Sequence, residues 1–204
     1  MKSMDNKDQV PATNPDVDHF EKWAPTYEQS FRQRLYFGPV HAKMLDTLVR
    51  INRKDPPGCI LDVGCGTGRL LRAVSAVWPK AQLLGVDPAE QMISEARRLN
   101  VHAIFKLGTA EALPIPDQTV DLVLSSLSFH HWANQQKGIM EIARVLRPGG
   151  WFCLADHALL LAKYWGEKVK SGSEISEMMN TAGLTVRQHH TMGIRFVLIT
   201  LAQK

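Results

Sequence analysis

The sequence predicts an α/β fold in which a mainly parallel sheet is covered by helices on both faces. Three observations lead to this prediction. From residue 58 onward, short apolar runs alternate with stretches of helical periodicity. The apolar runs carry hydrophobic residues at consecutive positions, as strands buried on both faces do. Near the end of the chain, two strand-like runs are joined by only three residues, which requires an antiparallel pair.

The elements follow one another in a regular order along the chain. Residues 18–30 are helix-like but contain Pro25, which is expected to break the helix, and a second helix is expected over 39–53. The remaining expected elements are strand 59–63, helix 67–77, strand 81–86, helix 89–99, strand 101–107, strand 120–126, helix 134–146, strand 151–156, helices 158–169 and 173–182, and the hairpin 184–202.

The chain of 204 residues, 45% of them hydrophobic, is long enough for a single domain with a substantial core. Residues 1–17 are polar and contain proline, so we expect a flexible tail there. The domain is expected to span 18–204, with 18–53 as a helical cap and 58–204 as a Rossmann-like core. The tail has no apolar signal core and no apolar run reaches membrane-spanning length, which predicts a cytoplasmic protein without a membrane span.

Charge and cysteine content exclude several other classes of protein. The net charge of +4 permits an anionic substrate but does not require nucleic acid. Cys59, Cys65 and Cys153 form no C-x-x-C pair, so neither a disulfide framework nor a zinc site is expected. His189 and His190 are adjacent on a predicted strand and point to opposite faces. The sequence therefore predicts no metal site.

The stretch "ILDVGCGTGRL" (60–70) places three glycines between a predicted strand and a predicted helix. Glycine permits positive φ and leaves room for a ligand, and the free N–H groups of the following helix point at the loop. Ligands of open parallel sheets bind beyond the carboxyl ends of the strands. The dinucleotide pattern G-x-G-x-x-G is not matched, because Arg69 stands where its third glycine would be.

Two acidic residues accompany this loop. Asp87 ends the second strand, about 20 residues beyond the glycines, where an acid is placed to accept hydrogen bonds from ribose hydroxyls. Asp87 could instead cap the following helix, with Pro88 at the first helical position, or it could do both. Asp62 ends an apolar strand, where a carboxylate needs a partner. That partner could be the cation of a ligand or the N–H groups of the loop.

Four stretches occur in order along the chain: "ILDVGCGTGRL", "GVDPAEQM", "GTAEALPIPDQTVDLVLSSLSFHHW" and "IARVLRPGGWFCLAD". Together they resemble the ordered motifs of the class I S-adenosylmethionine-dependent methyltransferases. The resemblance runs from about residue 20 to the end and is strongest to the small-molecule branch, type 11, which includes the quinone-biosynthesis C-methyltransferases. It implies a doubly wound, seven-stranded sheet in the order 3-2-1-4-5-7-6 with strand 7 antiparallel.

The resemblance implies S-adenosyl-L-methionine as cofactor and a set of residues that would bind it. Thr109 stands where the family often has an aspartate, so the Ala110 backbone N–H becomes the expected adenine contact. Glu111 could contribute or be an exposed loop acid, and Tyr27 could cover the cofactor or be a core aromatic residue. The cofactor-binding residues implied are Tyr27, Asp62, Gly64, Cys65, Gly66, Gly68, Asp87, Pro88, Met92, Thr109, Ala110, Glu111 and Ser125.

The stretch "SFHHW" (128–132) follows the fourth strand, at the edge of the sheet where the methyl group would lie. A general base there would assist in-line transfer to an oxygen, carbon or nitrogen acceptor, while alignment supplies most of the catalysis. His130 is the first candidate for this base and His131 the second. Either histidine could instead be hydrogen-bonded to local backbone.

Three other functions are open to this sequence. The chain could bind the cofactor as a regulatory or partner protein without methyl transfer. A nucleic-acid methyltransferase is disfavoured, because the Asn- or Asp-Pro-Pro-aromatic stretch after the fourth strand is absent and no cysteine lies in a suitable setting. A NAD-dependent dehydrogenase is disfavoured by the glycine spacing. The leading prediction is a methyltransferase with a small-molecule acceptor and no nucleic-acid partner.

Overall fold

The computed structural model describes residues 15–28, 31–100, 102–158, 168–193 and 196–204. Two helices, α1 (Pro15–Tyr27) and α2 (Phe31–Ile51), precede the sheet. The elements that follow are β1 (Cys59–Val63), α3 (Arg69–Val77), β2 (Gln82–Asp87), α4 (Glu90–Leu99), β3 (Ala103–Leu107), β4 (Val120–Ser126), the 3₁₀ turn η1 (Phe129–His131), α5 (Gln135–Val145), β5 (Leu146–His157), α7 (Gly172–Thr181), β6 (Thr185–Met192) and β7 (Val197–Gln203).

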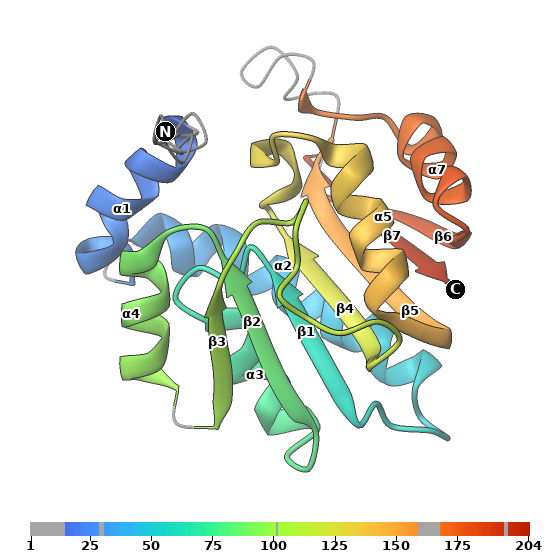
Figure 1. The fold of residues 1–204 in the computed structure, drawn as a ribbon, viewed down its shortest axis with the longest axis horizontal. Coiled ribbons are helices and arrows are strands. Elements are labelled where there is room, and N and C mark those ends of the chain that lie inside the picture. The colour runs from blue at the N-terminus through green and yellow to red at the C-terminus, as the bar shows by residue number, and fades with distance from the viewer. Residues whose placement is uncertain (1–14, 29–30, 101, 159–167, 194–195) are drawn as a thin grey trace, which may run out of the picture.

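One seven-stranded sheet organises the molecule (Figure 1). Its order is β3-β2-β1-β4-β5-β7-β6, with β1 to β5 parallel to one another. Strand β7 runs antiparallel to both β5 and β6. The predicted fold class, strand order and terminal hairpin are confirmed. The parallel strands end at one edge of the sheet, and this edge carries the site described below.

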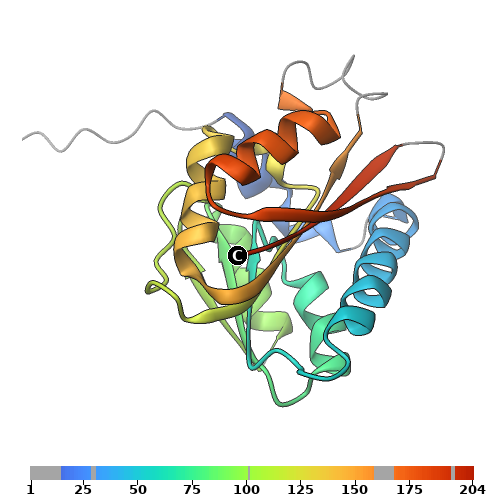
Figure 2. The same ribbon diagram turned by 90° about the vertical axis from the view of Figure 1, so that its right-hand side faces the viewer.

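Helices cover both faces of the sheet, as the doubly apolar strands require (Figure 2). On one face α2, α3 and α4 pack against buried side chains such as Ile60 and Leu122. On the other face α5 and α7 pack against Leu61 and Phe152. Neighbouring positions of one strand thus enter different core clusters, because successive side chains of a strand point to opposite faces.

Helix α1 departs from the prediction at both ends. It begins at Pro15, inside the stretch predicted as a tail, and residues 1–14 of that stretch lie outside the described residues. It also continues through Pro25 to Tyr27 instead of breaking there. Packing of Ala24 with Ala89 and Met92 stabilises this end of the helix and offsets the backbone hydrogen bond that proline cannot donate.

Strand β5 begins earlier than predicted, at Leu146 instead of Trp151. The intervening Pro148, Gly149 and Gly150 resemble a turn, but they form an irregularity in the pairing with β4, where Val120 faces Leu146 and Leu122 faces Trp151. Most of the predicted helix 158–169 lies outside the described residues. Among the residues that are described, no helix is both long and apolar enough to cross a membrane.

Candidate functional site

A cavity of about 470 Å³ opens at the carboxyl ends of the central strands. This volume is within the range of small-molecule sites. The loop between β1 and α3 forms its floor, and residues 86–88, 108–111 and 126–133 contribute further walls. Side chains of α1 and α2 lie across it, including Phe20, Tyr27 and Phe37. The helical cap and the core therefore share one site.

The three glycines of the loop all have positive φ, but for different structural reasons. A Cβ at Gly64 would overlap the Ser128 side chain, so glycine is needed there for packing. At Gly66 no atom lies within 4 Å of the Cβ position, and the open space beside it belongs to the cavity. Gly66 is thus the glycine whose missing side chain leaves room for a ligand.

Asp87 is held rigidly at the end of β2. Its Oδ2 accepts a hydrogen bond from the Gly66 backbone N–H (2.8 Å), and its Oδ1 accepts one from the Ala89 N–H (2.9 Å). Burial raises the pKa of Asp87 to about 6, against these two hydrogen bonds. Each carboxylate oxygen has a second lone pair that could accept from a ligand hydroxyl.

Asp62 lies in the same cavity wall, at the end of β1. Its side chain is buried, and its Oδ1 has no hydrogen-bond partner among the described residues. Burial, reinforced by the nearby charge of Asp87, raises the pKa of Asp62 to about 8. The charge of Asp87 disfavours ionisation of Asp62, and a cation beside Asp62 would offset this repulsion. Ligand N–H groups or a positive centre would supply what Asp62 lacks.

These features fit the cofactor that the sequence resemblance implied. S-adenosylmethionine presents an ammonium and a sulfonium, two ribose hydroxyls and an adenine ring. Asp62 Oδ1 is a buried acceptor without a partner among the described residues, Asp87 offers two oriented oxygens, and the space beside Gly66 admits a ligand close to the backbone. Pro88, Met92 and the 109–111 segment line another part of the cavity.

Thr109, Ala110 and Glu111 all line the cavity. Glu111 has a structural role as well, because its Oε1 accepts a hydrogen bond from the Asn134 backbone N–H (2.9 Å) just before α5. Cys65 and Tyr27 also belong to the cavity wall. Cofactor contact by these residues remains a prediction.

Three predicted site residues do not line the cavity in the described structure. Gly68 instead permits the close approach of Asn100 and Phe105, which a Cβ would meet within 3 Å. Ser125 is fully buried, and its hydroxyl pairs with that of Ser128 (2.8 Å). The side chains that reach the cavity from this region are those of 126–128 and 131–133, because the chain turns after β4.

The third residue is His130, and here the structure reverses the predicted ranking of the two histidines. His130 is 1% exposed and is directed to Asp156, with Nδ1 2.6 Å from Oδ1 and the backbone N–H donating to Oδ2. His131 lines the cavity, and its Nδ1 lies 3.1 Å from Asp16 Oδ2. Burial and the neighbouring His130 lower the pKa of His131 to about 4, so its imidazole is neutral at pH 7.

The helical cap contributes residues to the site that were not predicted from the sequence. Asp16 fell within the predicted tail, although it lies in α1 and contacts both His131 and Lys168. Phe20 packs edge-on against His131, with ring centroids 5.0 Å apart. Arg69, noted only as a departure from the dinucleotide pattern, also lines the cavity. The apolar spacing of α1 could have indicated Phe20, whereas nothing local distinguishes Asp16.

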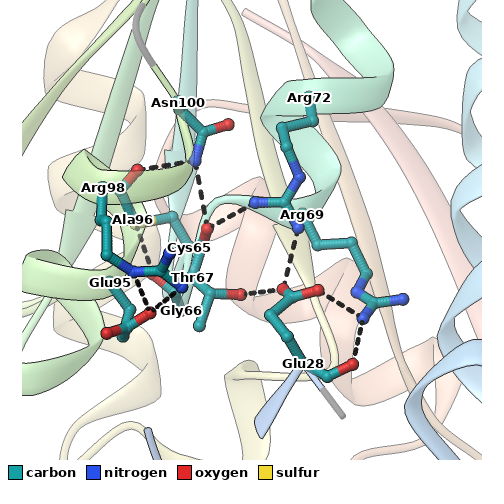
Figure 3. Close-up of polar contacts among 10 residues, drawn as sticks. All are labelled: Glu28, Cys65, Gly66, Thr67, Arg69, Arg72, Glu95, Ala96, Arg98 and Asn100. Atoms are coloured by element: carbon teal, nitrogen blue, oxygen red, sulfur yellow. Dashed lines mark hydrogen bonds and ion pairs between the residues drawn. The ribbon is translucent and has the colours of Figure 1, made fainter. Parts of the chain in front are cut away.

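Polar contacts attach helix α1 to the core. They come from an acidic side chain within the helix and from one just after its C-terminal end. Glu21 caps the N-terminus of α4, accepting from the Glu90 (2.5 Å) and Gln91 (2.9 Å) backbone N–H groups. Just after α1, Glu28 accepts from the Thr67 hydroxyl and pairs with Arg69 (2.6 Å) and Arg72 (2.8 Å), as Figure 3 shows. We call these contacts of Glu28 with Thr67, Arg69 and Arg72 the clasp.

Replacing Glu28 by glutamine should loosen α1 without unfolding the core. The clasp is about one-quarter exposed, so we expect a loss of about 1 kcal/mol in the free energy of unfolding. Amide hydrogen exchange should become faster in α1, while β1 and β4 stay protected. A matched control is Glu95→Gln, which breaks an exposed pair with Arg98 on α4. If the amide hydrogens of α1 exchange at the same rate in both variants, the clasp does not hold α1 to the core.

Comparison with known proteins identifies the type of domain. Residues 61–154 match the family model described as "Methyltransferase domain". A malonyl-[acyl-carrier protein] O-methyltransferase of Methylococcus capsulatus is 40% identical over 98 residues, which are 47% of this chain and 36% of that protein. The chain thus spans little more than a third of this relative, and 54% of the length of an uncharacterized methyltransferase of Mycobacterium bovis.

Two solved structures share the fold. One is a Haloferax volcanii methyltransferase complex with the Trm112 methyltransferase activator, with a TM-score of 0.73, 22% identity, and 90% of this chain and 96% of that chain covered. The other is a SAM-dependent methyltransferase from Aquifex aeolicus, with a TM-score of 0.70, 22% identity, and 92% and 98% covered. At this identity the likeness establishes the fold alone.

Proposed function

We propose that this chain, which belongs to the class I S-adenosylmethionine-dependent methyltransferases of the type 11 family, transfers a methyl group to a small organic acceptor. The observation that carries the proposal is the pairing of Asp62 and Asp87 in one cavity beside the glycine loop. A buried carboxyl with one oxygen that has no partner among the described residues, next to a second carboxyl fixed by backbone N–H groups, is suited to a ligand with a cation and vicinal hydroxyls.

Each part of the cavity has a distinct proposed role in cofactor binding. Asp62 would pair with the ammonium of the methionine portion, and the open space beside Gly66 would admit that portion close to the backbone. Asp87 would accept hydrogen bonds from the ribose hydroxyls. Met92 and the Ala110 backbone N–H would contact the adenine. Bound there, S-adenosylmethionine would supply an electrophilic methyl group on a sulfonium for in-line displacement.

The cap and His131 would provide the remaining requirements for transfer. Helix α1 places Phe20 and Tyr27 over the cavity, which would exclude water and align the acceptor. His131 is neutral at pH 7 and borders the cavity, so it could take the proton released by a hydroxyl, amine or carbon acid. The Asp16 carboxylate beside it would stabilise the imidazolium that results.

The cavity supports a small acceptor, and oxygen, carbon and nitrogen nucleophiles all suit the arrangement. The Methylococcus relative is named for an oxygen acceptor, malonyl-[acyl-carrier protein], but the chain covers 36% of that protein. An oxygen acceptor is therefore the first class to screen. Binding of the cofactor without any transfer, as in a regulatory or partner protein, is the other outcome of the test below.

Calorimetric titration with S-adenosylmethionine and with S-adenosylhomocysteine tests the proposal, with NAD as control. We expect micromolar binding of the first two, about −8 kcal/mol, and none of NAD. Binding of S-adenosylmethionine at pH 7 should release up to about one proton, because Asp62, with a pKa of about 8, must lose its proton to pair with the ligand ammonium, which is still charged at this pH. Proton release should appear as heat that depends on the buffer.

The absence of binding by folded, ligand-free protein would overturn the proposed function. Binding that is confirmed would lead to a transfer assay with methyl-labelled cofactor and a panel of carboxylic acids, phenols and amines. Label recovered in a small-molecule fraction would support the enzyme, whereas tight binding without label in any acceptor would favour the regulatory alternative.

A further inference from the structure

Three side chains that commonly bind metals meet near the cavity but are not among the described residues that line it. His130 lies in η1 after β4, and Asp156 and His157 end β5. One ligand atom from each residue lies within 4.8 Å of the other two. The parallel pairing of β4 with β5, in which Ser126 faces Ala155, brings these strand ends together. We call the three residues the His–Asp–His cluster.

The carboxylate of this cluster is fixed by the backbone of both histidines. Asp156 Oδ2 accepts from the His130 N–H (2.8 Å), and Oδ1 accepts from the His157 N–H (2.8 Å). Oδ1 also lies 2.6 Å from His130 Nδ1. Asp156 and His130 are 3% and 1% exposed, respectively, so these two side chains are shielded from water. The backbone contacts orient the carboxylate, and bonds to an ion would replace the hydrogen bond between His130 Nδ1 and Asp156 Oδ1.

His157 completes the set, and its ring is held by a contact outside the cluster. Its Nδ1 lies 3.1 Å from the Tyr36 hydroxyl, an outer contact of the kind that fixes the tautomer and orientation of metal-binding histidines.

We propose that His130, Asp156 and His157 bind one divalent first-row transition metal ion, such as Zn²⁺. Two imidazoles and one carboxylate form the donor set of catalytic zinc sites, which keep at least one position for water or substrate. Structural zinc sites instead have four protein ligands, usually with cysteine. The Asp156 carboxylate would balance part of the charge of the ion.

The position of the cluster suggests what the ion would act on. The ring centroid of His130 lies 3.9 Å from that of His131, which lines the cavity. An ion in the cluster would therefore adjoin the region assigned to the acceptor, and an oxygen of that acceptor could take its open position. This consequence rests on the proposed methyl transfer, whereas metal binding itself does not.

The test uses the full chain without an affinity tag, stripped with a chelator. Titration with Zn²⁺ by calorimetry and with Co²⁺ by visible absorption should show one ion per chain, with a Kd of about 1 μM or lower. Bound Zn²⁺ should also raise the melting temperature. None of these readouts involves the cofactor, so failure of the metal site and failure of methyl transfer can be told apart.

Single variants show whether Zn²⁺ binds at the His–Asp–His cluster or at other histidines. His157→Ala should weaken Zn²⁺ binding by at least about 10–100-fold, and Tyr36→Phe should have a smaller effect. His190→Ala removes a histidine of β6 that contacts Gln188, and it should leave the affinity unchanged. His157 is only partly buried, so its alanine variant should fold even if Asp156→Asn does not. A wild-type protein that binds no Zn²⁺, or binds it as weakly as His157→Ala, would overturn the proposal.

Discussion

Replacing Asp62 by asparagine is expected to weaken S-adenosylmethionine binding by about 10–100-fold and, at pH 8, to stabilise the ligand-free protein. The two effects have one cause. The Asp62 carboxylate is buried, and its Oδ1 has no hydrogen-bond partner among the described residues. The ionised group therefore destabilises the ligand-free protein but can pair with a bound cation. Asparagine keeps the shape and removes the charge.

The sign of the stability effect follows from the pKa of Asp62. That pKa is about 8 in the folded protein and about 4 in an unfolded chain. A carboxyl whose folded pKa is raised contributes stability below pH 4, and this contribution is lost as the pH rises to 8. Asp62→Asn should therefore raise the free energy of unfolding only slightly at pH 4 and by on the order of 2–5 kcal/mol at pH 8.

Asp121→Asn is the matched control, because Asp121 lies at the opposite edge of the sheet. Its Oδ2 accepts from the backbone N–H groups of Gly58 (2.9 Å) and Cys59 (2.8 Å). This variant should lower stability and leave cofactor affinity unchanged. Chemical denaturation at pH 4 and pH 8, with calorimetry of binding, measures both quantities. Unaltered affinity in folded Asp62→Asn protein would remove Asp62 from the site.

Replacing His131 by alanine is expected to lower kcat by about 10²–10⁴-fold while changing cofactor affinity little. The reason is geometric, since His131 borders the cavity and is supported by Asp16, whereas His130 is turned toward Asp156. The measurement is methyl transfer to whichever acceptor the screen identifies, with His190→Ala as a control of unchanged rate.

The pH profile distinguishes a base from a merely structural histidine. His131 has a pKa of about 4, so wild-type kcat should stay level from pH 8 to about 5 and fall as the pH approaches 4. Thermal melts at each pH confirm that the protein is folded. The variant should lack this decline. Full activity of His131→Ala over the whole range would end its assignment as base.

The apolar runs predicted all seven strands, although burial differs among them. Strands β1, β2, β4 and β7 are buried at most positions, whereas the edge strands β3 and β6 are mostly intermediate or exposed. The hairpin followed from the three-residue connection between its strands, which is too short for a crossover. What escaped prediction depended on distant contacts. Helix α1 continues through Pro25 because Ala24 packs on α4, and β5 starts before Gly149 because β4 pairs with it. Neither contact leaves a local trace in the sequence.

The residues of the candidate site were also predictable only in part. The location of the glycine loop, Asp62 and Asp87 at one cavity was predictable, because the carboxyl ends of neighbouring parallel strands meet at the same edge of the sheet, whereas their roles in binding remain predictions. The roles of His130 and His131 were not, since a three-residue turn has no periodicity that tells which side chain faces a cavity. The His–Asp–His cluster joins residues 26 positions apart, and only the register of β4 and β5 brings them together.

The two buried carboxyl groups have a consequence for the lifetime of the protein in a cell. Near neutral pH the empty chain bears the unfavourable burial of Asp62 and Asp87, and a bound cation would relieve it. The fraction of unfolded molecules, which proteases remove, should then increase when the cofactor becomes scarce. Abundance of the protein would follow the supply of its methyl donor without any dedicated regulator.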